Sequence, residues 1–223
     1  MTAAEWFRHT SWSPADAADF GARLERSRSA FHRAQYLRIQ AAHLHEAGTH
    51  PLAEAAFGLL DQLLAEWPDE SQLSSAHKQR AGCLIDLGRP EEALAAYQAA
   101  LAARRVSPNF GNDAHHGFAE LAVALRRDDL YDEALAALAE FARDEPFPAQ
   151  QYRSAAARAM IADRRGDRAV TARRPQRGRM PRSQQRPRWR RRSPVTARSG
   201  WCAPPTRRCS RAYGSSRPDE HSR

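Results

Sequence analysis

The sequence has little of what would mark a secreted or membrane protein. Its three cysteines, Cys83, Cys202 and Cys209, are an odd number without paired spacing, which argues against a disulfide framework and favours a reducing compartment. The first residues carry Glu5 and Arg8 and no long apolar run, so we expect no secretory signal. No stretch approaches the ~20 apolar residues of a membrane span. We therefore expect a cytoplasmic protein with no membrane contact.

Catalytic and metal-binding motifs are also missing. We find no phosphate loop, nucleophile elbow, catalytic triad or HExxH motif. His43, His45 and His50 gather near one predicted helix end, but the first two are two residues apart and lie on different helix faces. Cys202 and Cys209 lack the second pair that a zinc site needs. The sequence therefore predicts no enzyme activity, no metal and no cofactor.

Lysine is nearly absent, and the charge is unevenly distributed. Lys78 is the one lysine among 35 basic residues, the other 34 being Arg. Residues 1–167 hold 18 basic and 24 acidic residues, whereas residues 168–223 hold 17 Arg and 2 acids. The net charge of +9 therefore describes neither part, and we place a boundary after Asp167.

What the chain does contain is a clear helical hairpin between Gln79 and Leu101. Apolar residues recur at helical spacing on both sides of Gly88, which is placed to end the first helix in a left-handed turn. Pro90 begins the second helix, where its missing N–H costs nothing. Acidic residues follow in the first turn of that helix, where the helix dipole favours them.

This hairpin resembles a tetratricopeptide repeat. That family's pattern has a small residue in the first helix, Gly at the turn, and small, aromatic and small residues in the second helix. The matching positions here are Ala81, Gly88, Ala93, Tyr97 and Ala100. The resemblance implies a helical solenoid that presents a concave face for a peptide or a partner helix.

Similar patterns flank the central hairpin. The matching positions upstream are Ala41, Gly48, Ala55 and Leu59, and those downstream are Phe118, Ala122, Tyr131, Ala134 and Leu138. The downstream copy has Asp129 where Gly is expected at the turn. Ala55, Ala93 and Ala134 are 38 and 41 residues apart, longer than the family's usual ~34. A fourth copy begins at Gln151 and stops after its first helix.

We therefore predict an all-α fold, a short right-handed solenoid of three full hairpins plus an incomplete fourth. Residues 1–34 form a lead and one helix, residues 35–167 the repeats, and residues 168–223 a disordered tail rich in Arg, Pro and Ser. In the lead, Trp6, Phe7 and Trp12 are expected anchors, and Phe20, Leu24 and Phe31 an expected buried face. Residues 5–170 also look like uncharacterised bacterial tetratricopeptide proteins, a resemblance that implies no chemistry.

The resemblance implies a set of groove residues on the first helices. They are Arg38, His45, Ser75, Lys78, His116, Arg126, Arg127 and Arg153. The set is basic, so it implies an acidic segment or a C-terminal carboxylate as partner. The competing interpretation is that these are ordinary solvated side chains. For His115 and His116, at a helix start, we expect capping or solvent exposure, and for Asp113 a capping role.

Two functions follow from these patterns. The first is a non-enzymatic scaffold or adaptor that binds a protein or peptide. The alternative is an RNA- or DNA-associated protein acting through the Arg-rich tail, by phosphate contacts and stacking on Trp189, Trp201 and Tyr213.

A second interpretation of the tail is that it is a frameshift product. The Arg-rich, Lys-poor composition indicates GC-rich coding, in which Arg is mostly CGN. Reading one base earlier converts such codons to Ala or Pro, and plausible codons then give an Ala-rich helix where the fourth repeat lacks its second helix. The apolar face of Tyr152, Ala156, Ala159 and Met160 would otherwise stay partly uncovered.

Overall fold

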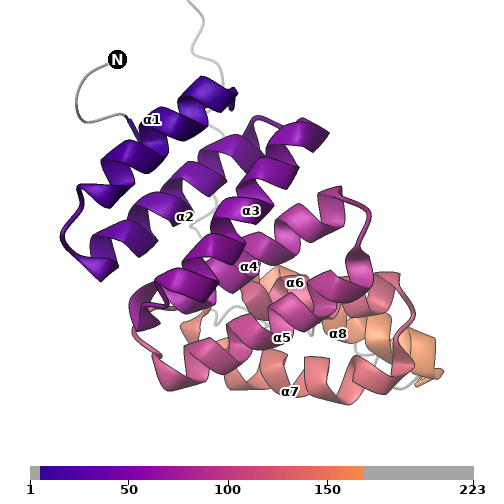
Figure 1. Cartoon of the computed structure of the whole chain (residues 1–223). Coiled ribbons are helices and arrows are strands. Elements are labelled where there is room, and N and C mark those ends of the chain that lie inside the picture. The colour runs from indigo at the N-terminus through magenta and orange to yellow at the C-terminus, as the bar shows by residue number, and fades with distance from the viewer. Residues whose placement is uncertain (1–5, 168–223) are drawn as a thin grey trace, which may run out of the picture. The chain divides into compact units, whose positions relative to one another are not determined.

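The computed structural model describes residues 6–167, and every structural statement below concerns these residues. They form eight α-helices and two short 3-10 segments without a strand (Figure 1). The elements are, in order, α1 (Pro14–Glu25), α2 (Ala30–Glu46), α3 (His50–Glu66), α4 (Glu70–Asp86), α5 (Pro90–Val106), α6 (Ala114–Ala124), η1 (Asp128–Leu130), α7 (Tyr131–Glu140), η2 (Ala142–Asp144) and α8 (Pro148–Arg165). The predicted all-α class is confirmed. The predicted disorder of residues 168–223 lies outside the described residues.

Consecutive helices pack as hairpins, α2 with α3, α4 with α5 and α6 with α7, and each hairpin contacts the next (Figure 1). The first two turns use the glycines that the sequence indicated. Gly48 and Gly88 have φ angles of 76° and 72°, a left-handed conformation that other residues adopt only with strain. Proline then lies in the first turn of both α3 and α5, where it costs no hydrogen bond.

The third turn differs from the prediction. Asp129 was expected at the left-handed position, but α6 ends early and Arg126 takes that conformation, with a φ of 56°. The amide of Arg127 then donates to the Ala122 carbonyl at 2.9 Å, and the short segment η1 leads into α7. Arg127 also pairs with Asp129 and with Glu91 at the start of α5, so side-chain contacts hold a turn that lacks glycine.

Two buried clusters make up the core, one over α1 to α4 and one over α4 to α8. Phe57 packs against both and therefore joins them. Cys83 is fully buried and fills the core as a small apolar residue. Tyr97 lies so close to α6 that a Cβ atom added at Gly117 would be 2.6 Å from its ring, so this helix contact requires glycine.

The N-terminal lead is anchored by aromatic side chains, as predicted. Trp6 lies 4.9 Å from Tyr36 and 5.4 Å from Phe20 between ring centroids, and Trp12 lies 5.6 Å from Phe20. The expectation that Phe31 is buried is wrong, because its side chain is 39% exposed. Ser13 caps α1, and Asp16 completes a capping box with it.

Candidate functional site

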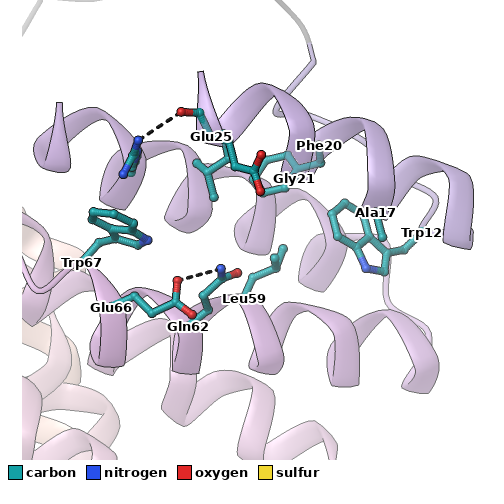
Figure 2. Close-up of a pocket in the computed structure, with 11 residues that line it drawn as sticks. Trp12, Ala17, Phe20, Gly21, Glu25, Leu59, Gln62, Glu66 and Trp67 are labelled. Carbon is teal, nitrogen blue, oxygen red and sulfur yellow. Dashed lines mark hydrogen bonds between the residues drawn. The ribbon is translucent and has the colours of Figure 1, made fainter. Parts of the chain in front are cut away.

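A groove lies between α1 and α3, beside α2 (Figure 2). Its volume is about 520 Å³, and Phe20, Leu24 and Leu59 line its apolar part. Room for a ligand comes from Gly21 on α1, because a Cβ atom added there meets no atom within 4 Å. A concave apolar site with few polar groups is the usual form of a binding pocket.

The two ends of the groove carry different groups. Trp12 and Trp67 lie at opposite ends (Figure 2). At the Trp67 end, Arg33 stacks on the indole at 4.3 Å and donates to the Glu25 backbone carbonyl at 3.0 Å. Glu66 lines the same end and accepts from Gln62 at 3.0 Å. Glu25 and Glu66, both exposed, outnumber Arg33 among the charged residues that line the groove, which favours a cation.

Most basic side chains of the predicted groove are paired with other residues of the chain. Arg38 donates to Gln72 at 2.6 Å, and His45 contacts Asp86 at 2.7 Å, both across the step from α2 to α4. Asp113, which lies at the start of α6, forms salt bridges with both Lys78 of α4 and Arg153 of α8. Arg153 also forms two hydrogen bonds with Glu120, each 2.8 Å long. Most of this set therefore ties neighbouring hairpins together.

The charges around Asp113 replace the capping role predicted for it. Its side chain makes no cap hydrogen bond, and Asn112 accepts from the Ala114 amide at 2.9 Å instead. Burial alone would raise the pKa of Asp113, but Lys78 and Arg153 outweigh it and lower that pKa to about 2. Asp113 is therefore an ionised link between three successive first helices.

The other predicted groove residues lie elsewhere. Arg126 and Arg127 belong to the turn after α6, and Ser75 is half-buried on α4. The expectation that His115 and His116 are exposed is wrong, because both are buried. Their rings lie 4.1 Å apart between centroids, and both Nε2 atoms face the same carboxylate oxygen of Glu145.

The buried cluster of His115, His116, Glu145 and Ser154 has the residue types of a metal or catalytic site. Its two histidine Nε2 atoms lie 3.2 and 3.1 Å from Glu145 Oε1, and Ser154 also bonds that oxygen. In tetrahedral zinc sites with bonds of ~2.0–2.1 Å, ligand atoms lie at comparable separations. The distances alone therefore fit either a metal site or a hydrogen-bonded network.

Contacts on the far side of the rings favour the network. His115 Nδ1 lies 3.3 Å from Arg104 Nη1, and a guanidinium can only donate. His115 Nδ1 must therefore accept, which leaves the proton on Nε2, facing Glu145, where a metal would need a lone pair. His116 Nδ1 is buried without a partner, whereas histidines that bind metals donate that N–H to an acceptor.

The network also sets the protonation of its members. Burial and the neighbouring His116 lower the pKa of His115 to about 4. Burial alone would raise the pKa of Glu145, but hydrogen bonds from Ser154 and His115 outweigh it, and that pKa is lowered. An ionised Glu145 that accepts three hydrogen bonds fastens the link between α7 and α8 to the start of α6.

Sequence reasoning missed both the groove and the cluster. Glu145 comes from an irregular link about 30 residues after the two histidines, so no spacing rule connects them. The small pair Ala17 and Gly21, one helical turn apart on α1, was the available signal for the groove.

No described helix is long and apolar enough to cross a membrane. No family model, curated protein or solved structure matches this chain.

Proposed function

We propose that this chain is a non-enzymatic binding protein of the tetratricopeptide-like type that holds a peptide or partner helix in the groove between α1 and α3. The observation that carries the proposal is the groove itself, with buried apolar walls and an indole at each end. Aromatic and aliphatic anchors in such pockets supply most of the affinity of protein interfaces. The contacts of the buried histidine cluster are internal, which leaves the groove as the better candidate for a ligand.

The chemistry of the groove favours an apolar partner segment with one basic side chain. Leu24 and Leu59 suit aliphatic or aromatic groups, and the lining acids Glu25 and Glu66 suit Lys or Arg. The acidic partner inferred from the sequence rested on basic side chains that are paired within the chain. We therefore propose a basic amphipathic segment in its place.

Panning a library of displayed random peptides on the full chain tests this proposal. Gly21→Leu fills the groove with a side chain and improves helix propensity by up to ~1 kcal/mol, so it should abolish binding while keeping the melting temperature. Gly58→Leu is the matched control, because Gly58 is also a helical glycine with open space around it and does not line the groove.

We expect the enriched peptides to combine apolar residues with Lys or Arg. They should bind the Gly58→Leu variant normally and fail to bind the Gly21→Leu variant. Glu66→Gln should lower the affinity of these peptides several-fold. Peptides that bind both glycine variants equally would refute the groove as the binding site. A panning experiment that enriches no peptide would refute it as well.

A second candidate function rests on composition. Residues 168–223 carry 17 Arg and three aromatic residues, a composition suited to nucleic acid backbones and base stacking. Salt-sensitive retention on RNA that disappears on truncation after Asp167 would favour this function.

A further inference from the structure

Helix α8 ends in the same way as α4, the first helix of the central hairpin. The amides of Gly88 and Arg89 donate to carbonyls three and five residues back, at 3.0 and 2.8 Å. Those of Gly166 and Asp167 repeat this pattern at 3.1 and 2.9 Å, and Gly166 has a φ of 78°. In the earlier hairpins this turn reverses the chain into the second helix. Helix α8 therefore has the geometry of a first helix whose partner should follow.

Burial at equivalent positions shows that this partner is missing among the described residues. Seven residues before each left-handed residue stand Ala41, Ala81, Ala119 and Ala159. The first three are at most 1% exposed, whereas Ala159 is exposed. Fourteen residues before Gly166 stands Tyr152, which is 74% exposed.

The uncovered positions form one stripe along α8. Tyr152, Ala155, Ala159 and Met160 recur at helical spacing on the side away from Ile161, and all four are exposed. In the complete hairpins, α4 and α6 likewise bury alanines beside larger apolar groups, such as Ala81 with Leu84 and Ala119 with Phe118. Its complement is an amphipathic helix rich in Ala and Leu, as α5 and α7 are.

Residues 168–223 as written do not encode such a helix. They contain no Leu, Ile or Phe, and their 17 Arg are interspersed with proline. The change occurs directly after Gly166 and Asp167, at the turn where the second helix should begin.

The reading frame one base earlier can encode one. Trp and Met each have a single codon, so the bases at these two residue types are known without any assumption. Trp189 becomes Leu, Val or Met, and Pro181, which follows Met180, becomes Ala. Every Arg written CGN becomes Ala or Pro when the preceding codon ends in G or C. Where the preceding codons end in G, the frame from Arg173 to Arg192 gives a run dominated by alanine, the best helix former.

We propose that the stripe of Tyr152, Ala155, Ala159 and Met160 is the docking face for the second helix of a fourth hairpin, and that this helix is the segment coded from position 173 onward in that earlier frame. The inference continues the interfaces of the three complete hairpins. It is independent of the groove function, and it excludes a native nucleic-acid role for the Arg-rich tail.

The direct test is to titrate a synthetic peptide with the earlier-frame sequence of positions 173–192 onto the full 223-residue chain. We expect saturable binding, with a gain of helix signal. Ala159→Glu should abolish it, because the charge enters the docking face. Ala102→Glu, at an exposed alanine of α5, should leave it unchanged.

The second arm expresses the gene with the frame shifted before codon 168. That chain should melt at a higher temperature, and Ala159→Glu should lower its melting temperature by roughly 5 °C. Stop codons early in the shifted frame, peptide binding unaffected by Ala159→Glu, or a dimer that this substitution dissociates would each overturn the proposal. The last result would assign the stripe to a second copy of the chain.

Discussion

Gly117 is the residue on which the contact between α5 and α6 depends most directly. A Cβ atom added there would lie 2.6 Å from the Tyr97 ring, and that ring is confined by buried neighbours on both helices. Overpacking of this kind costs ~1–3 kcal/mol, more than the ~1 kcal/mol that replacing helical Gly by Ala gains. We expect Gly117→Ala to lower the free energy of unfolding by about 1–2 kcal/mol in urea titrations.

Gly82→Ala is the matched control. Its added Cβ atom would meet only the imidazole of His45, at 2.9 Å, and that ring is partly exposed and able to move. Equal losses for the two variants would contradict the close approach of Tyr97.

Asp113 is the residue that joins three hairpins. Asp113→Asn leaves Lys78 and Arg153 without their shared carboxylate, and we expect a loss of roughly 1–3 kcal/mol in the free energy of unfolding. Asp19→Asn, which removes an exposed pair with Arg23 on α1, should cost only ~0.3–0.5 kcal/mol. Chemical denaturation of both variants measures this difference. Equal small losses would show that the ion pairs of Asp113 with Lys78 and Arg153 contribute nothing to stability.

At the scale of elements, the link between α7 and α8 should make the fold sensitive to acid. The folded-state pKa of His115 is about 4, below its ordinary value of 6.5. Between these values the unfolded chain binds a proton that the folded chain does not. The free energy of unfolding should therefore fall by up to ~1.4 kcal/mol for each pH unit from pH 6.5 down to pH 4.

His115→Gln keeps an N–H donor for Glu145 but does not titrate, so its stability should fall less steeply over this range. His50→Gln, at an exposed histidine of α3, should keep the original slope. Urea titrations at several pH values measure both slopes, and an unchanged slope for His115→Gln would contradict the assignment of a neutral buried His115.

The sequence predicted helices and hairpins better than it predicted what lies between them. Gly88, Pro90 and Tyr97 act locally or at helical spacing, and the structure has them in the expected roles. The early turn at Arg126 was missed because ion pairs from Arg127, rather than a glycine, hold it.

The partners of the predicted site residues were missed for a related reason. The basic side chains Lys78 and Arg153 were placed on the first helices correctly, but the pattern does not show which acid faces each of them. Asp113 has the local sequence of a helix cap, and only the stacking of hairpins reveals that it binds cations from two other helices.

At the scale of the whole molecule, residues 6–167 hold two adjoining cores, and every described hairpin is closed except the last. The groove and the open face of α8 are thus features of one helical stack, and both proposals depend on that stack forming without the Arg-rich tail.

The most direct test is circular dichroism of a fragment that ends at Asp167, followed through a thermal melt. We predict a spectrum dominated by α-helix and a single cooperative transition. A spectrum with little helix, or a gradual loss of signal without a transition, would contradict the account.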